Sequence, residues 1–172
     1  MGRTSIPPGR ASDTMCRVRR LDTTDARILL ALDSDPRATV LGLSRLLGLA
    51  RGTVQAHLER LEADGVLDSF TRRLAPAALG FTVTAFVMVE IHQIRQDRAL
   101  EGLSQIPEVL EVHGITGESD LMCHVAARDA DHLYLVGQAI LAVEGVTRTR
   151  TSLAMRELVP YRITPLLRGL VE

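Results

Sequence analysis

Hydrophobic residues follow two different periods along the chain, and the change falls near residue 80. Before it, apolar side chains recur with the 3.6-residue period of a helix, and from Phe81 onward they alternate with the two-residue period of a strand. The segment Thr39–Asp64 gives the clearest helical signal, because it reads as two short helices hinged at Gly48. The apolar face consists of Val40, Leu43, Leu46 and Leu47 in the first helix and of Val54, Leu58 and Leu61 in the second. The pattern therefore predicts a helix pair that buries one face and leaves the other free.

Local signals set the ends of the predicted helices. Thr39 can cap the first helix of the pair through its hydroxyl, and Gly48 suits a sharp turn that needs a positive φ. An earlier helix begins with Asp22 or Thr23 as its cap and ends before a proline. We therefore expect three helices in residues 21–67.

A helix, a glycine turn and a second helix with a polar leading face form the helix-turn-helix pattern. In that motif the second helix enters the major groove and presents its first two turns to base edges. Side chains such as Arg51 and Gln55 can hydrogen-bond bases there, and Arg60 is placed for a phosphate. The predicted DNA-facing set consists of Arg51, Gly52, Thr53, Gln55, Ala56, His57 and Arg60. The same pattern also fits an ordinary pair of helices within a core, so these residues alone leave that alternative open.

Residues 81–172 predict the order β-α-β-β-α-β, which is that of a ferredoxin-like sandwich. The expected elements are a strand at Phe81–Ile91, a helix at Arg98–Ile106 with Asp97 as its cap, strands at Val109–Ile115 and Leu121–Ala127, a helix at Ala130–Val143, a strand at Val146–Met155 and a tail at Val159–Glu172. The predicted fold class is therefore α+β. It combines an N-terminal three-helix, winged helix-turn-helix domain with a C-terminal ferredoxin-like βαββαβ domain.

The first strand of this rear half is apolar on both faces at its middle. Its two faces carry Val83, Ala85 and Val87 on one side and Thr84, Phe86 and Met88 on the other. A strand that is buried on one side only shows a polar outer face. We therefore expect helices to cover one face and a further layer, such as a second subunit, to cover the other.

The charge is unevenly distributed between the two halves. Residues 1–80 hold 12 arginines against 9 acidic residues, whereas residues 81–172 hold 8 against 12, and the chain has no lysine. Phosphate-binding surface therefore belongs to the front half. The predicted divisions are a disordered basic tail at 1–20, the helix-turn-helix domain at 21–67, a linker at 68–80 and the ferredoxin-like domain at 81–172.

Two basic segments lie outside the predicted helices. The tail at 1–20 fits either a basic arm that touches DNA or a dispensable extension. In the linker, Arg72 and Arg73 fit either a wing over the DNA backbone or solvated charge, and we include both in the predicted DNA-binding set.

Several classes of function have no signal in the sequence. The two cysteines, Cys16 in the polar tail and Cys123 in an apolar run, support neither a disulfide framework nor a metal site, and a reducing, cytoplasmic setting fits them. No apolar run approaches the ~20 residues of a membrane span. Walker, zinc-protease and serine-hydrolase motifs do not occur, so we expect neither an enzyme nor a bound cofactor.

A set of residues that can be compared with known families is spread over both halves of the chain. In chain order they are Leu21-Asp22, Asp25, Ile28-Leu29, Leu61-Glu62, Gly65-Val66, Leu79-Gly80, Pro107, Val109, Gly117-Glu118-Ser119-Asp120 and Gly145-Val146. Through them residues 21–155 resemble the Lrp/AsnC, or feast/famine, family of bacterial and archaeal transcription regulators. Two positions depart from the family pattern: Ala50 stands where the recognition helix usually has a serine cap, and His57 replaces a common arginine.

The resemblance implies a C-terminal domain that dimerises, assembles further into a ring such as an octamer, and binds an amino-acid effector. The carboxylate of an amino acid needs backbone N–H groups at a glycine turn, and its ammonium needs a carboxylate. The candidate effector contacts that offer both are Gly114, Thr116, Gly117, Glu118 and Asp120. Without the resemblance, a hairpin turn whose aspartate caps its own backbone would explain the same residues.

The expected function is sequence-specific binding of double-stranded DNA by a transcriptional regulator that a small effector modulates. A second reading is a stand-alone amino-acid sensor that acts on a protein partner. Arg51, Gln55 and the basic front half favour the first reading.

Overall fold

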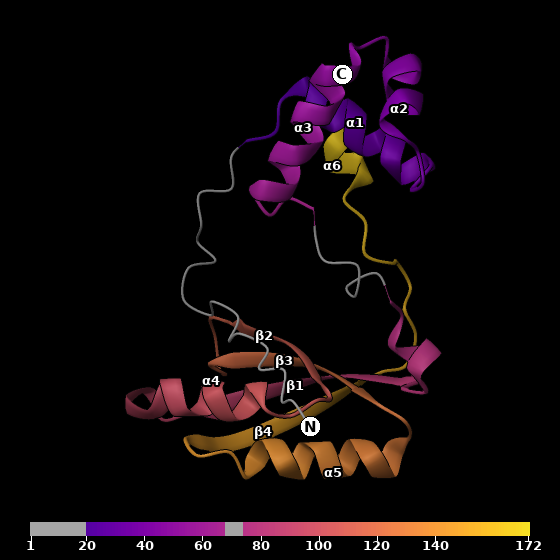
Figure 1. Ribbon diagram of the computed structural model, residues 1–172. Helices are drawn as coiled ribbons and strands as arrows, with labels where there is room; N and C mark the ends of the chain where they lie inside the picture. Colours follow the sequence, from indigo (N-terminus) through magenta and orange to yellow (C-terminus); the bar gives the residue numbers. More distant parts are fainter. Residues whose placement is uncertain (1–19, 68–73) are drawn as a thin grey trace, which may run out of the picture. The chain divides into compact units, whose positions relative to one another are not determined.

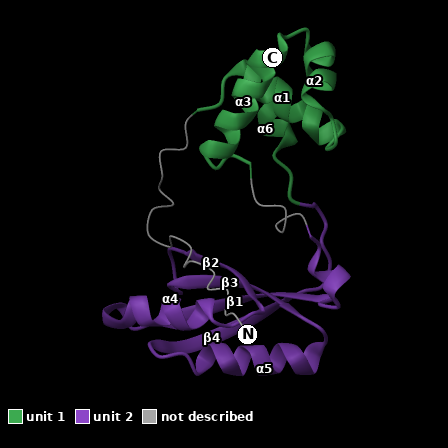
Figure 2. Ribbon diagram, in the orientation of Figure 1, with its two compact units in different colours: residues 1–69, 161–172 green, residues 70–160 purple. Residues whose placement is uncertain are grey.

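The computed structural model describes residues 20–67 and 74–172, which form two units (Figures 1 and 2). The helical unit comprises residues 1–69 and 161–172, and the sheet unit comprises residues 70–160. Residues 1–19 of the predicted tail, and both Arg72 and Arg73, lie outside the described residues. Each unit is considered by itself.

The helical unit contains the three predicted helices and one that was not predicted. They are α1 (Thr23–Ser34), α2 (Val40–Leu47), α3 (Arg51–Ala63) and α6 (Thr164–Arg168). The core of the first three consists of the buried side chains Ile28, Ala31, Leu43 and Val54. This core confirms that α2 and α3 bury one face each and pack on α1.

The predicted helix ends are confirmed by backbone geometry and hydrogen bonds. Asp22 caps α1, because its Oδ1 accepts the N–H of Asp25 at 2.8 Å while the N–H of Asp22 donates back to Asp25 Oδ2 at 3.0 Å. The hydroxyl of Thr39 accepts the N–H of Gly42 at 3.1 Å at the start of α2. Gly48, after α2, has a φ of 66°, which a residue with a side chain adopts only at a cost.

The prediction that Leu46 belongs to the buried face of α2 is wrong. Leu46 is 70% exposed, although Leu43 in the same helix is fully buried. Successive residues are about 100° apart around a helix. Leu46 therefore lies about 60° beyond Leu43 and further still from Val40 and Leu47, outside the buried stripe.

The C-terminal segment returns to the helical unit and contacts α1. Leu167 of α6 is buried, and the hydroxyl of Thr164 donates to Asp33 Oδ2 at 3.1 Å. The hydroxyl of Thr23 donates to the carbonyl of Leu170 at 3.3 Å. The predicted division, which placed all of 81–172 in one domain, thus differs from the structure over residues 161–172.

The sheet unit has the predicted order β-α-β-β-α-β. Its elements are the 3-10 turn η2 (Pro76–Leu79), β1 (Val83–Ile91), the 3-10 turn η3 (Gln93–Arg95), α4 (Gln96–Ser104), β2 (Val109–Gly114), β3 (Leu121–Ala127), α5 (Ala130–Leu141) and β4 (Val146–Ala154). The strands form one antiparallel sheet in the order β2-β3-β1-β4, with β1 in the interior. This is the ferredoxin-like topology, so the predicted α+β fold class is confirmed.

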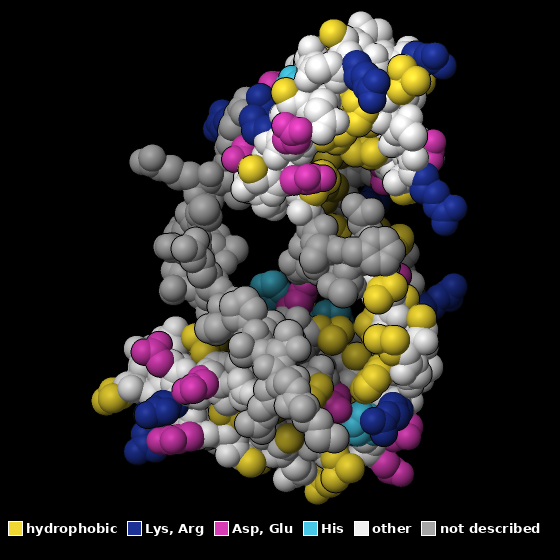
Figure 3. All heavy atoms as spheres, viewed as in Figure 1, with side chains coloured by type: hydrophobic (Ala, Val, Ile, Leu, Met, Phe, Trp, Pro, Cys, Tyr) yellow, Lys and Arg dark blue, Asp and Glu magenta, His cyan; other side chains and the backbone are white. Residues whose placement is uncertain are grey.

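Both long helices of the sheet unit cover the same face of the sheet. Leu103 of α4 and Ile140 of α5 share a core with Ala85, Val87 and Val89 of β1. The opposite face, which we call the open face, has Phe86 and Met88 of β1 beside His124 and Met122 of β3. These four residues are partly buried, and no described helix of the sheet unit packs on them. Hydrophobic side chains reach the surface of both units elsewhere as well (Figure 3).

Two local predictions in the sheet unit need correction. Asp97 does not cap α4, because η3 leads directly into the helix and Arg95 takes the cap position. Asp97 instead lies in the first turn, where a carboxylate favours the helix dipole. The first strand begins at Val83, two residues later than predicted.

Candidate functional site

The leading face of α3 is free in the helical unit. Val54 and Leu61 of α3 are buried, whereas the side chains of the first two turns that point away from the core are exposed. The exposed members of the predicted DNA-facing set are Arg51, Gly52, Thr53, Gln55 and Ala56. Within this set Gln55 donates to Glu59 Oε1 at 2.7 Å, one helical turn further on.

The N-terminus of α3 has no side-chain cap. Ala50 is the cap residue, and its methyl group offers no acceptor to the first N–H groups of the helix. The N–H groups of the first turn and the positive end of the helix dipole are a suitable binding site for a phosphate oxygen. Because alanine stands at the position where the family usually has a serine, no side chain of the cap residue accepts from the N–H groups at the start of α3.

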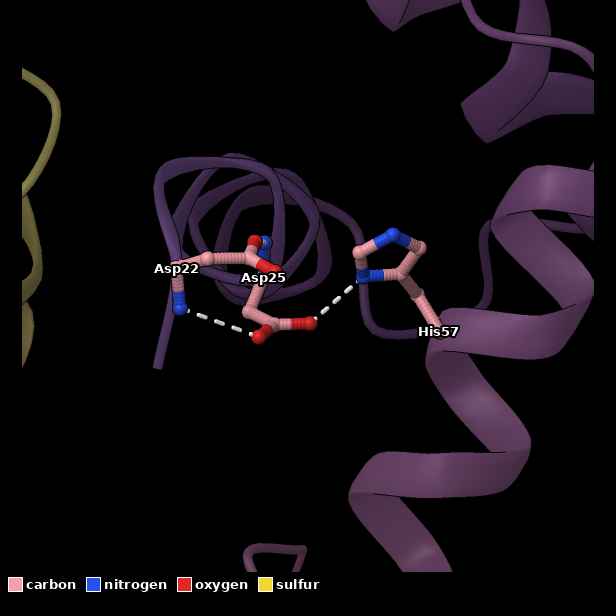
Figure 4. A group of neighbouring side chains, drawn as sticks. All are labelled: Asp22, Asp25 and His57. Carbon is pink, nitrogen blue, oxygen red and sulfur yellow. Dashed lines mark hydrogen bonds and ion pairs between the residues drawn. The ribbon is translucent and has the colours of Figure 1, made fainter. Parts of the chain in front are cut away.

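His57 and Arg60 belong to the predicted set but turn toward α1. Asp25 is 2% exposed, and its Oδ1 lies 2.6 Å from Nδ1 of His57 and 2.8 Å from Nη2 of Arg60. Figure 4 shows the imidazole reaching from α3 to this carboxylate, whose other oxygen receives the N–H of Asp22. Nη2 of Arg60 also lies 3.6 Å from Asp22 Oδ2. We call Asp22, Asp25, His57 and Arg60 the polar cluster.

The polar cluster keeps Asp25 ionised. Burial by itself would raise the pKa of this carboxyl, but the hydrogen bonds from His57, the backbone of Asp22 and Arg60 together bring the pKa below its ordinary value. Asp22, Asp25 and His57 also bring three potential metal-ligand atoms within 4.8 Å of one another. The guanidinium of Arg60 already lies against Asp25, and a divalent cation beside it would be repelled.

The predicted effector loop joins β2 to β3. Gly114, Thr116, Gly117 and Glu118 are exposed, and Gly117 has a φ of 125°, which favours glycine. Asp120 is partly buried, and its Oδ2 accepts the N–H of Ile91 at 2.8 Å, where the pairing of β1 with β4 is irregular. The loop therefore uses one oxygen of Asp120 to hold the end of β1.

The second carboxylate of the loop also has a partner. Glu118 Oε2 accepts from Nη1 of Arg150 on β4 at 2.9 Å, and this hydrogen bond lowers the pKa of Glu118. The Glu118 side chain is 83% exposed and that of Arg150 is 45% exposed, so the pair contributes little to stability. A carboxylate and a guanidinium thus lie next to each other at the surface beside Gly117.

Sequence reasoning missed two partners of the predicted site residues. Asp25 was named only among the residues that carry the family resemblance, and not as the partner of His57, which is 32 residues away. The spacing of His57 and Arg60, one turn apart beside the buried stripe, was the available signal. Arg150 lies on a strand that alternates arginine with threonine, which indicates that one face of that strand carries charge.

The sheet unit also contains a hollow and a buried cysteine. A hollow of about 540 Å³ lies beside the open face, between residues 74–81 and the β2–β3 edge, and His124 and Leu110 line it. The effector loop does not contribute to its lining. Burial raises the pKa of the Cys123 thiol to about 11, so this cysteine stays protonated at neutral pH.

Comparison with known proteins agrees with both halves of the chain. Residues 21–68 match the model of a winged helix-turn-helix DNA-binding domain, and residues 84–164 match that of the Lrp/AsnC ligand-binding domain. The HTH-type transcriptional regulator AldR of Mycolicibacterium smegmatis is 34% identical over 155 residues, which cover 88% of this chain and 90% of AldR.

Solved structures share the fold. The feast or famine regulatory protein of Mycobacterium tuberculosis complexed with L-methionine is 30% identical, with a TM-score of 0.73 over 83% of this chain and 97% of that chain. Escherichia coli AsnC, at 23% identity, shares the fold with a TM-score of 0.77 over 86% of this chain and all of its own.

The matches also settle the class of protein. These relatives are transcriptional regulators rather than enzymes, as the sequence led us to expect. Among the described helices, none has both the length and the apolar character that crossing a bilayer requires. The chain belongs to the Lrp/AsnC family of helix-turn-helix transcriptional regulators.

Proposed function

We propose that this protein regulates transcription in the cytoplasm by binding specific double-stranded DNA through the leading face of α3. The observation that carries this proposal is the exposure of Arg51, Thr53 and Gln55 in the first two turns of a helix that Val54 and Leu61 hold in the core. Arginine and glutamine pair with two atoms of guanine and adenine, respectively, in the major groove. The uncapped first turn after Ala50 then receives a backbone phosphate.

Replacing Arg51 by alanine is expected to reduce discrimination between an operator and random DNA. Loss of one two-point contact to a base costs about 1–3 kcal/mol on the operator and little elsewhere. Fluorescence anisotropy titrations with duplexes from the DNA upstream of the protein's own coding sequence, and with random duplexes, measure both affinities. Gln55→Ala is expected to act in the same way.

Two controls make this result specific. Arg98→Ala removes an exposed arginine from the sheet unit and leaves both affinities unchanged. Arg72→Ala, outside the described residues, weakens both DNAs alike if that arginine contacts only phosphates. An equal loss on both duplexes from Arg51→Ala would show that Arg51 is a phosphate contact and not a base contact.

We further propose that an amino acid is the effector and that the β2–β3 loop binds it. One solved relative is complexed with L-methionine, which supports an amino acid as the class of ligand. The N–H groups around Gly117 and the free oxygen of Asp120 suit its carboxylate and ammonium. Arg150 and Glu118 offer a second pair of complementary charges beside them. The proposed contacts are Gly114, Thr116, Gly117, Glu118, Asp120 and Arg150.

The variant Asp120→Asn separates binding from structure. Asparagine keeps an oxygen for the N–H of Ile91 but removes the charge that an ammonium requires. We expect the melting temperature to stay near that of the wild type, while the affinity for the effector falls about ten- to a hundredfold. Calorimetric titration of each amino acid, beside a thermal melt, measures the two. Unchanged effector affinity in this variant would leave Asp120 as a turn residue only.

We also propose that the protein is a homodimer that pairs through the open face and assembles further into a ring such as an octamer. The support is the apolar character of Phe86, Met88 and Met122, which form the centre of a sheet face that the described helices leave uncovered. Apolar patches of this kind mark interfaces between proteins.

A further inference from the structure

The helical unit has a single histidine. The chain contains five histidines, and only His57 lies in residues 1–69 or 161–172. Histidine is the side chain whose charge ordinarily changes between pH 5 and 8. His57 is therefore the one side chain of this type in the helical unit.

The contacts of His57 cannot all be hydrogen bonds at the same time. Its Nδ1 lies 2.6 Å from Asp25 Oδ1 and 2.7 Å from Nη2 of Arg60, and those two atoms are 2.8 Å apart. A ring nitrogen either carries a proton and donates or has a lone pair and accepts. The contact with Asp25 requires the proton and the contact with Arg60 requires the lone pair. A ring with a proton on Nδ1 therefore donates to Asp25, and a ring without one there accepts from Arg60.

The two states differ in which cation neutralises Asp25. A neutral ring adds no net charge in either tautomer, so Arg60 remains the charged partner of Asp25. A protonated ring donates to Asp25 and places two cations in contact, which repel each other. His57 is only 14% exposed, whereas Arg60 is 33% exposed and can move toward solvent. Repulsion therefore displaces Arg60 and not His57.

The surrounding charges do not cancel this effect. On α1, Asp22 attracts Arg60 at 3.6 Å, but its side chain is 45% exposed and the attraction is screened. On α2, the other helix that packs on α3, the charged residue is Arg45, and no ion pair joins it to His57 or Asp25 in the described part of the chain. Asp25 is therefore the carboxylate for which His57 and Arg60 compete.

We propose that His57 and Arg60 exchange as the counter-ion of Asp25, so that protonation of His57 releases Arg60 to a DNA phosphate. The ring takes its proton from solvent, α3 stays joined to α1 through Asp25 in both states, and the number of phosphate contacts rises by one in acid. His57 is then a positioning residue for Arg60. This inference rests on the proposed DNA binding by α3.

The salt dependence of DNA binding counts phosphate contacts and therefore tests the exchange. Duplexes from the DNA upstream of the coding sequence, and random duplexes, are titrated at several salt concentrations at about pH 5.5 and about pH 8. For the wild type we expect the slope of log K against log salt to be steeper in acid by about 0.9 for each bound subunit. His113→Gln, an exposed histidine of the sheet unit, keeps this difference.

Variants of the polar cluster have distinct expected results. His57→Gln gives the shallow slope at both pH values, and His57→Arg, with a permanent charge, gives the steep slope at both. Arg60→Ala abolishes the difference, because the released cation is absent. Equal wild-type slopes, or a difference that survives in His57→Gln or Arg60→Ala, would overturn the exchange. Failure of the proposed function looks different, because the wild type would then not prefer the upstream duplex at either pH.

Discussion

Replacing Asp25 by alanine is expected to lower the melting temperature of the helical unit by at least about 10 °C. The change removes the carboxylate that His57 and Arg60 share and half of the capping box of α1. Removing one partner from a buried ion pair costs about 3–5 kcal/mol, because the remaining charges stay without compensation. In a domain of this size 1 kcal/mol corresponds to several degrees. Thermal unfolding followed by circular dichroism measures the shift.

A matched control and a pH series make this prediction sharper. Glu62→Ala removes an exposed carboxylate from α3 and should change stability by less than about 0.5 kcal/mol. Because the pKa of Asp25 is lowered from 3.8, its ionised form stabilises the folded state above that value, and this stability disappears as the pH falls through the lowered pKa. The difference between the wild type and Asp25→Asn should therefore shrink in strong acid. An Asp25→Ala protein that melts like the wild type would contradict the role of the polar cluster.

The variant Phe86→Glu is expected to dissociate the proposed dimer. Phe86 stacks on His124 with ring centroids 5.2 Å apart at the centre of the open face. In a dimer that covers this face, the glutamate would be buried without a cationic partner, which costs several kcal/mol. The dissociation constant of the full-length protein should rise by at least about a hundredfold. Sedimentation velocity over a range of concentrations measures it, and Met88→Glu should act in the same direction.

Tyr134→Glu is the matched control for the open face. Tyr134 is an aromatic residue of α5 that is 65% exposed, and α5 packs on the other face of the sheet. The dimer should survive this change. A Phe86→Glu protein that sediments like the wild type would place the dimer contact elsewhere.

The period of the hydrophobic pattern predicted most of the fold. The i, i+4, i+7 stripe of Val54, Leu58 and Leu61 predicted α3, and the alternation after Phe81 predicted β1, because each period is imposed by burial of one face. The pattern was less informative in short elements. In α2, which has eight residues, it misplaced Leu46. The five residues of α6 are too few to show a period.

The candidate site was predicted only in part, for a different physical reason. The exposure of Gly52, Thr53 and Ala56 follows from their position away from the buried stripe, which the sequence contains. The partners of His57 and Glu118 are distant in sequence, at Asp25 and Arg150, and only the folded chain brings them together. Long-range polar contacts leave no periodic signal, so His57 was assigned to the groove although its imidazole faces α1.

The return of the C-terminal segment to α1 has a consequence for synthesis on the ribosome. Helix α6 follows the whole sheet unit in the chain, so residues 20–67 leave the ribosome well before Leu167 does. Domains that are contiguous in sequence can fold as they emerge. Here the helical unit completes its surface only after the sheet unit has been translated. Nascent chains that stall after β4 would therefore carry a recognition helix on a domain that still exposes the docking surface of α6.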